Sequence, residues 1–249
     1  MITFDQIRDR IEPLRGDKKP REAQLAFQIG ARRLASETYG LEEIVLFTLP
    51  AGAFRVEPYQ YASAIVTDDG YQITIDPATW QSTDNPFQKE TVLVVKADYQ
   101  TASGSWNGLH GYNEQLMFKH HHHVEPASGS SLRAYASDRG QFRPNRPMLI
   151  DTQIRAVVAY QPVGDFTGVE FSHEYEDALV EGALASYLRL PGKDMDRREA
   201  AECEARFLSM ASALRGMSLI GAQGYARGST HPRHGKRWSR FMSQDVLDY

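Results

Sequence analysis

The chain has 249 residues, of which 41% are hydrophobic and 24% are charged, an ordinary balance for a globular protein. No apolar run approaches the length that spans a bilayer, and residues 1–19 lack the apolar core of a secretory signal, so we expect no membrane partner. The single cysteine, Cys203, excludes an intramolecular disulfide. The net charge of −4 is uneven, because Gly216–Tyr249 carries +3 and the remainder carries −7.

The sequence of residues 1–40 predicts a short N-terminal lead segment followed by one helix. The segment Pro20–Tyr39 has the three- and four-residue apolar spacing of an amphipathic helix, and Gly40 provides a stop signal after it. Five residues share the apolar face of this predicted helix: Ala23, Phe27, Gly30, Ala31 and Leu34.

Residues 41–170 change to the pattern of β-strands, with short β-branched runs separated by turn residues. Thr67–Gly70 ends in Asp-Gly, which favours a hairpin turn, and Gln161-Pro162 is expected to end the last strand. Five strands are predicted: Ile44–Phe47, Ala62–Val66, Tyr71–Ile75, Thr91–Val95 and Ile154–Tyr160. Their spacing predicts a small antiparallel sheet or sandwich inserted between helices.

The segment 98–131 within this region is rich in Ser, Gly, Asn and His, and it is too long for an ordinary connection. One interpretation is a projecting arm or extended hairpin that orders against a neighbouring subunit. The other is a flexible surface loop. Under the first interpretation, the expected contacts with a neighbouring protein are Trp106, Tyr112 and Phe118.

Residues 171–218 predict two helices joined by a Pro-Gly break. Leu190-Pro191-Gly192 is expected to end the first helix, and Asp194 or Asp196 to begin the second. Ser172 is the expected cap of the first helix. The first apolar stripe contains Leu179, Val180, Ala183, Leu184, Tyr187 and Leu188, and the second contains Ala200, Cys203, Phe207, Met210 or Ala211, Leu214 and Met217. This spacing predicts a helical hairpin that packs with the helix of residues 20–39.

Residues with catalytic or metal-binding character form no recognisable constellation. The run His120–His123 alternates between two faces of an extended segment, so we expect a structural or adventitious role and no functional metal site. His173 precedes the acidic segment Glu174–Asp177, which is typical of a helix start. Cys203 falls on an apolar stripe and is interpreted as a core residue. We therefore expect no enzyme, with no catalytic residue, metal or cofactor.

Residues 219–249 have no sustained apolar period, but they combine basic and aromatic side chains. Their positive charge beside an acidic body favours attachment to a complementary surface, and aromatic residues are typical interface anchors. We expect an extended arm that folds onto a partner. Binding of nucleic acid through phosphate contacts and base stacking is the alternative. The expected contact residues of the arm are Tyr225, Arg227, Arg233, Lys236, Arg237, Trp238, Arg240, Phe241 and Tyr249.

The segment Gly182–Lys193 reads GALASYLRLPGK, and Ala200, Phe207 and Ala213-Leu214-Arg215 follow at helical intervals. This pattern resembles the head-to-tail adaptor proteins of tailed bacteriophages, of the short-tailed type. The resemblance covers the hairpin and extends more loosely to the N-terminus, where the family has an apolar-faced helix after a short extended lead. The chain departs from the family pattern at Asp194-Met195, where an aromatic residue is common.

The resemblance implies a structural protein of the virion, made in the host cytoplasm, that forms a ring below the portal at the head–tail junction. The implied partners are the portal protein, a tail nozzle or tail tube protein, and further copies of the chain in a dodecamer that matches the portal. Genomic DNA passes through the channel during ejection without sequence-specific binding. Residues 219–249 are then the portal-binding arm, and the segment 98–131 contacts the tail or a neighbour.

These segments predict an α+β protein with three parts. A helical bundle or hairpin is formed by residues 1–40 and 171–218, an antiparallel β-rich region is inserted at 41–170, and an extended C-terminal arm occupies 219–249.

Overall fold

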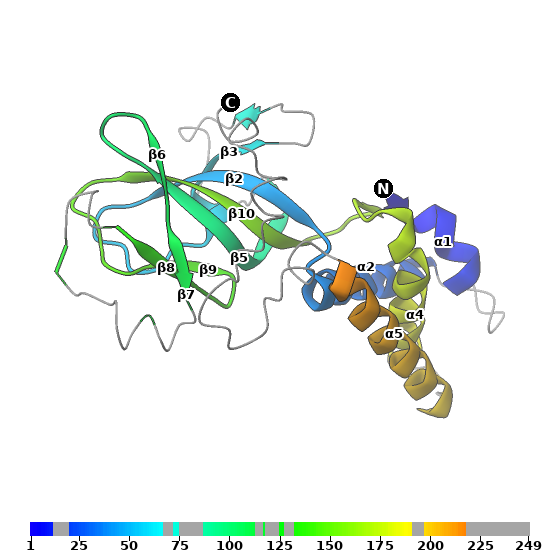
Figure 1. The fold of residues 1–249 in the computed structure, drawn as a ribbon. Coiled ribbons are helices and arrows are strands. Elements are labelled where there is room, and N and C mark those ends of the chain that lie inside the picture. Colours follow the sequence, from blue (N-terminus) through cyan, green and yellow to red (C-terminus); the bar gives the residue numbers. More distant parts are fainter. Residues whose placement is uncertain are drawn as a thin grey trace. The chain divides into compact units, whose positions relative to one another are not determined.

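A computed structural model describes residues 1–11, 20–66, 72–74, 87–112, 117, 125–126, 132–190 and 197–217 (Figure 1). These residues form two compact units, a helical unit within 1–41 and 161–217 and a β unit within 42–160. The chain enters the β unit at Glu42 and leaves it after Tyr160, and Glu42 pairs with Ala159 in the neighbouring strand. The protein is therefore an α+β protein in which a β unit interrupts a helical unit.

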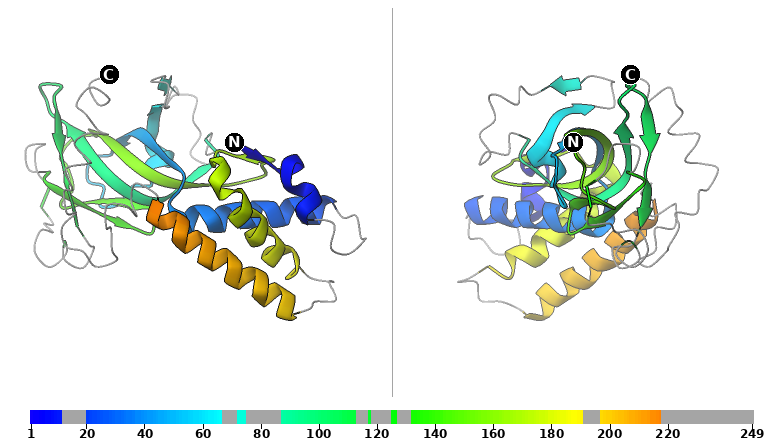
Figure 2. Two further views of the ribbon diagram at one scale, coloured as in Figure 1. Left: turned by 45° about the vertical axis from the view of Figure 1, so that its right-hand side comes forward. Right: turned by 90° about the vertical axis from the view of Figure 1, so that its left-hand side faces the viewer.

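The helical unit is built from α1, α2, α4 and α5 in its described residues. α4 packs against both α2 and α5, and α1 packs against α2 and α4. Figure 2 shows α4 and α5 side by side, as the two arms of a hairpin. The elements are β1 (Ile2–Thr3), α1 (Phe4–Ile11), α2 (Pro20–Thr38), β11 (Gly168–Val169), the 3-10 helix η4 (His173–Tyr175), α4 (Glu176–Tyr187) and α5 (Arg197–Met217).

The predicted apolar faces of the helices form the core of this unit. In α2, all five residues of the predicted face are buried. The same holds for the six stripe residues predicted in Leu179–Leu188. In α5, the buried residues are Ala200, Cys203, Phe207, Ala211 and Leu214. Because each large apolar side chain gains about 1.5–3 kcal/mol on full burial, these buried faces stabilise the packing of α2, α4 and α5.

The end of α2 lies close to the predicted stop, but the reason for the glycine differs. Tyr39, with a φ of 54°, is the residue in the left-handed region, and the Gly40 N–H donates to Thr38 Oγ1 at 3.1 Å. A Cβ atom on Gly40 would lie 2.6 Å from the ring of Tyr175. Gly40 is therefore required by the close approach of this ring.

Two predicted features of the N-terminal and hairpin regions are wrong. Residues 4–11 are helical instead of extended, because three apolar residues of Phe4–Ile11 lie on one buried face. Ser172 makes no side-chain cap bond to the backbone. Its Oγ instead donates to Glu174 Oε1 at 3.1 Å, and η4 stands between Ser172 and α4.

Residues 161–170 belong to the helical unit, although their sequence places them in the β-rich region. Side chains of α2 hold this segment by its backbone. Arg32 donates to the carbonyl oxygens of Pro162 at 3.1 Å and Gly164 at 2.6 Å, and Gln28 Nε2 donates to that of Phe166 at 3.0 Å. These contacts join residues more than 100 positions apart, so local pattern does not reveal them.

The β unit contains two sheets in its described residues. The larger sheet has the strand order β4-β3-β2-β10-β5-β6, and the smaller has the order β7-β8-β9. The strand pairs β2–β10, β2–β3, β3–β4, β5–β6 and β8–β9 are antiparallel, whereas β7–β8 is parallel. The elements are β2 (Glu42–Leu49), the 3-10 helix η1 (Pro58–Tyr61), β3 (Ala62–Val66), β4 (Gln72–Thr74), β5 (Lys89–Gln100), β6 (Trp106–Gly108), β7 (His110–Tyr112), β8 (Ala134–Asp138), β9 (Gln141–Pro144) and β10 (Thr152–Pro162).

The core of the β unit lies where the two sheets face each other. Phe142 of β9 stacks on Tyr135 with ring centroids 5.3 Å apart and meets Phe47 of β2 edge-on at 5.5 Å. Tyr135 also donates its hydroxyl to the Val95 carbonyl at 2.8 Å, which ties β8 to β5. A Cβ atom on Gly140, in the turn between β8 and β9, would lie 1.8 Å from the Thr91 carbonyl oxygen, so this turn requires glycine.

The strand predictions are largely confirmed, with two corrections. Four of the five predicted runs lie in strands, and of the fifth, Tyr71–Ile75, the described residues Gln72–Thr74 form β4. Strand β10 continues through Pro162 instead of ending before it. The predicted loop 98–131 begins as strand: β5 reaches Gln100 and forms a hairpin with β6, and β7 follows. Of the rest of that segment, only residues 117 and 125–126 are described. Strands β8 and β9 were not predicted.

Candidate functional site

Helices α2 and α4 approach each other closely where they cross. A Cβ atom on Gly30 would lie 2.7 Å from the backbone nitrogen of Ala183, and one on Gly182 would lie 2.9 Å from the Phe207 ring of α5. Three helices therefore meet at two glycines and one phenylalanine. Gly182 and Phe207 are both positions that carry the adaptor resemblance, so its pattern coincides with the packing centre of the unit.

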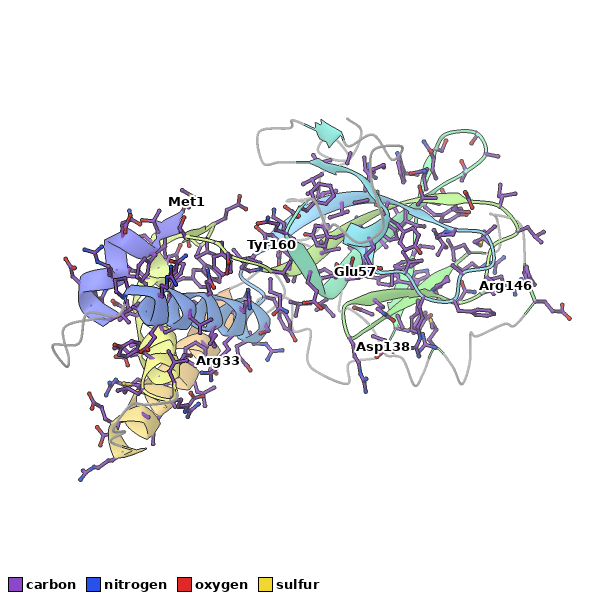
Figure 3. All side chains as sticks on the ribbon, turned by 180° about the vertical axis from the view of Figure 1, so that it is seen from behind. Met1, Arg33, Glu57, Asp138, Arg146 and Tyr160 are labelled. Carbon is purple, nitrogen blue, oxygen red and sulfur yellow. The ribbon has the colours of Figure 1, made fainter. Side chains whose placement is uncertain are left out.

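A charged clamp borders this crossing. Arg33 of α2 donates to the Glu204 carboxylate of α5, and Arg189 lies 3.1 Å from the other oxygen of that carboxylate. The Arg33 guanidinium also lies over the Phe207 ring, 4.7 Å from its centroid. Hydrogen bonding from Arg33 lowers the pKa of Glu204. Figure 3 shows where Arg33 lies on α2.

A second ion pair joins α4 to α5 on the same hairpin. Arg206 Nε lies 3.0 Å from Glu181 Oε1, and Arg206 also contacts the Cys203 sulfur at 3.3 Å. Burial raises the pKa of the Cys203 thiol, so the thiol stays protonated at neutral pH. Cys203 is buried on the apolar face of α5, as the sequence predicts for a core residue.

The acidic cluster at the start of α4 holds α1 in place. Arg10 of α1 lies 2.7 Å from Asp177 and 3.0 Å from Glu176, and the hydrogen bond to Asp177 raises the pKa of Arg10. His173 Nδ1 lies 2.7 Å from Glu176, but the His173 side chain is exposed. The carboxylates are thus engaged in joining two helices, and they do not converge on an enclosed site.

A polar network inside the β unit joins η1 to the three strands β2, β5 and β10. Lys89 Nζ lies 2.6 Å from Glu43 and 4.3 Å from the centroid of the Tyr160 ring, and the Tyr59 hydroxyl donates to Glu43. Burial raises the pKa of Tyr59 well above its ordinary value. Glu57 caps η1 by accepting from the Gln60 N–H. Each of these groups has a structural partner, so the network holds η1 against the neighbouring strands.

Trp106, predicted to contact a neighbouring protein, has a partner within its own unit. Its half-buried ring covers Arg155, whose guanidinium lies 4.6 Å from the ring centroid. Arg155 in turn lies 3.3 Å from Asp98 of β5. Tyr112 is also half-buried, but it lies on β7 in the other sheet. Phe118 lies outside the described residues, so the three predicted contacts are not brought onto one described surface.

The run His120–His123 and the predicted arm both lie outside the described residues. The expected contacts of the arm therefore remain predictions: Tyr225, Arg227, Arg233, Lys236, Arg237, Trp238, Arg240, Phe241 and Tyr249. Within the described ranges, no group of three or more His, Cys, Asp or Glu side chains is arranged to hold a metal ion.

One functional candidate was missed by the sequence analysis. Phe54, Leu149 and Ile150 are exposed large apolar residues in loops of the β unit. The only sequence signal is the pair Leu149-Ile150 between turn-forming Pro147 and Asp151, a short apolar run in a loop context.

No protein-family model matches the chain, and no curated protein matches it. Among the helices of the described residues, none is both long enough and apolar enough to cross a bilayer.

Proposed function

We propose that the protein is the head-to-tail adaptor of a tailed bacteriophage, forming a ring below the portal that joins it to the tail. The observation that carries the proposal is the coincidence of the resemblance with the packing of the helical unit. Gly182 of the GALASYLRLPGK segment allows the helix crossing, and the Phe207 ring of the following helix packs against Gly182. Arg215, from the last matching element, lies over the Tyr39 ring at 4.7 Å and ties α5 to the end of α2.

The proposed function is geometric and involves no catalysed reaction. Copies of the chain close a ring through heterologous contacts, in which one surface meets a different surface on the neighbour. The resemblance implies twelve copies, matching the portal. The helical unit forms the wall of this ring, and the β unit faces outward or toward the nozzle or tail tube. The net charge of −7 outside Gly216–Tyr249 suits a channel through which DNA slides during ejection, because like charges repel.

The proposed attachment to the portal uses the basic, aromatic segment 219–249. An arm that orders on binding loses conformational entropy, which buried aromatic side chains and charged contacts offset. Repetition around the ring strengthens a weak individual contact through avidity.

Electron microscopy of the purified protein mixed with purified portal rings tests the proposal. We expect a second ring, coaxial with the portal and with an open channel. Portal rings without added density, at protein concentrations in the micromolar range, would contradict it. Duplex DNA binding that falls steeply as salt is raised, without attachment to the portal, would favour the alternative of a nucleic-acid-binding protein.

A further inference from the structure

Three large apolar side chains are exposed together in the β unit. Phe54 is 44% exposed, Leu149 62% and Ile150 65%. They lie in the loop that follows β2 and the loop that precedes β10, which start side by side because Leu49 pairs with Thr152. We call Phe54, Leu149 and Ile150 the apolar tip. Grouped exposed apolar side chains mark interaction surfaces more often than single ones do.

The two loops are fixed to each other by hydrogen bonds. The Gly52 N–H donates to the Met148 carbonyl at 2.8 Å, and the Ala51 N–H donates to Asp151 Oδ1 at 2.8 Å. Met148 is itself fully buried, so the core position beside Leu149 is already filled. The apolar tip is thus held outward by a formed loop pair.

The charged groups next to the apolar tip are mainly cationic. Arg146 is half-buried, and its Nε is shielded from solvent without a hydrogen-bond partner in the described part of the chain. Arg55 forms a 3.7 Å ion pair with Asp138, and Arg143 lies 3.4 Å from the same carboxylate. Asp151 already accepts from the backbone. Arg146 and Arg55 thus give the surroundings of the apolar tip a positive character, which favours an acidic partner surface.

Figure 3 shows Arg146 at the end of the β unit that is remote from Tyr160, where the chain leaves the unit. Arg146 shares the loop Asn145–Asp151 with Leu149 and Ile150 of the apolar tip, so one contact can engage both.

We infer that the apolar tip and Arg146 of one copy dock onto an acidic surface of a second copy of this chain. Charge complementarity supports this occupant, because the chain outside Gly216–Tyr249 carries a net charge of −7. A tip-to-tip contact would oppose two Arg146 side chains, so the tip meets a different surface of its neighbour. Such a heterologous contact is the kind that builds a ring. The inference rests on the proposed function for the identity of the neighbour as a ring subunit.

The test compares Ile150→Asp with Ile150→Leu in the full-length chain. Assembly is measured by sedimentation velocity of the protein alone and by electron microscopy of its ring on the portal. Thermal unfolding checks that both variants fold. We expect Ile150→Asp to need at least about tenfold more protein for half-maximal assembly, since a central interface side chain often contributes that much. Ile150→Leu keeps the apolar contact and should assemble like the wild type.

A charge variant tests the second half of the contact. Arg146→Glu should weaken assembly, whereas Arg146→Lys keeps the charge and should weaken it less. Equal assembly of the wild type, Ile150→Asp and Arg146→Glu would overturn this inference while leaving the adaptor proposal intact. A wild-type chain that stays monomeric alone and on the portal would overturn both. Loss of binding to duplex DNA or anionic vesicles on Ile150→Asp, with assembly unchanged, would also overturn the inference.

Discussion

Single residues decide how closely the helices of this protein approach. Gly30 and Gly182 have no side chain where α2, α4 and α5 meet, and the Phe207 ring covers Gly182. The two glycines differ in what they face. Gly30 faces backbone atoms of α4, which cannot rotate away, whereas Gly182 faces a side chain that can shift.

This difference predicts unequal effects of alanine at the two positions. Alanine is favoured over glycine in a helix by about 1 kcal/mol, and overpacking typically costs about 1–3 kcal/mol. We expect Gly30→Ala to lower the free energy of unfolding by about 2 kcal/mol and Gly182→Ala by less. Urea unfolding measures both, with Leu25→Ala on the exposed side of α2 as the control, expected within about 0.5 kcal/mol of the wild type. A Gly30→Ala variant as stable as the wild type would show that α2 and α4 are farther apart.

Glu42, the first residue of β2, predicts a pH dependence of stability. Burial raises its pKa to about 7 from 4.5, and Oε1 is shielded without a hydrogen-bond partner among the described residues. Between these values the folded chain keeps a proton that the unfolded chain releases, so stability falls as pH rises from 4.5 to about 7. The full shift corresponds to about 3 kcal/mol, which partial exposure of the side chain reduces.

Glu42→Gln removes the ionisation and keeps the shape. We expect thermal unfolding of this variant to be less sensitive to pH across that window and its midpoint above that of the wild type at pH 8. Glu37→Gln, at an exposed position of α2, is the control and should follow the wild type. Parallel pH curves for the wild type and Glu42→Gln would refute the assignment.

Charged contacts join pairs of elements, and the contribution of each contact to the free energy of unfolding depends on its burial. Glu204 of α5 binds Arg33 of α2 and Arg189 at the end of α4, in partly buried surroundings. Glu202, two residues earlier, pairs with Arg198 on the same helix, and both side chains are exposed. The first contact joins three parts of the fold, and the second adds little because water screens exposed pairs.

Alanine at these two glutamates should therefore have different effects. We expect Glu204→Ala to lower the free energy of unfolding by about 2 kcal/mol, because two arginines lose their acceptor, and Glu202→Ala by less than about 0.5 kcal/mol. Since the pKa of Glu204 is lowered, its contribution is present above the unfolded pKa of 4.5 and is lost as pH falls through the folded pKa. Urea unfolding at pH 7 and at pH 3 measures both effects. Equal losses of unfolding free energy in Glu204→Ala and Glu202→Ala at pH 7 would show that Glu204 does not join the helices in this way.

The whole molecule combines a helical unit with a β unit inserted between α2 and the α4–α5 hairpin. Because the strands that enter and leave the β unit pair at Glu42 and Ala159, the insertion starts and ends at neighbouring points. All described residues of both units precede position 218.

Truncation after Ser218 is therefore expected to leave the described fold intact. The thermal midpoint should stay close to that of the full chain, while occupancy on portal rings should fall at least about tenfold, because every copy loses its arm. Electron microscopy with portal rings measures the occupancy. A variant with Trp238 and Phe241 replaced by Ser keeps the length and charge of the arm, and we expect it to show an intermediate loss. Normal occupancy of the truncated protein would contradict the role of the arm.

Local periodicity in the sequence predicted α2, α4 and α5 with their buried faces, and the strands β2, β3, β4, β5 and β10. The face that includes Phe27 and Leu34, and the stripe that includes Phe207, were predicted because burial repeats every three or four residues along a helix. The strands β2, β3 and β10 were predicted from β-branched runs, because β-branched side chains are enriched in strands. The resemblance in the hairpin was also read from sequence alone.

Tertiary structure decided what depends on residues far apart in the chain. The crossing of Gly30 over Ala183 and the ion pair of Arg33 with Glu204 each join positions more than 150 residues apart. The parallel pairing of β7 with β8 joins nearer residues, such as His110 and Ala134, but no local pattern specifies it either. Leu149 and Ile150 are apolar by composition, but only the filled core around Met148 leaves them exposed. Periodicity specifies which side of an element is apolar, whereas packing against distant elements decides which apolar side chains remain in contact with water.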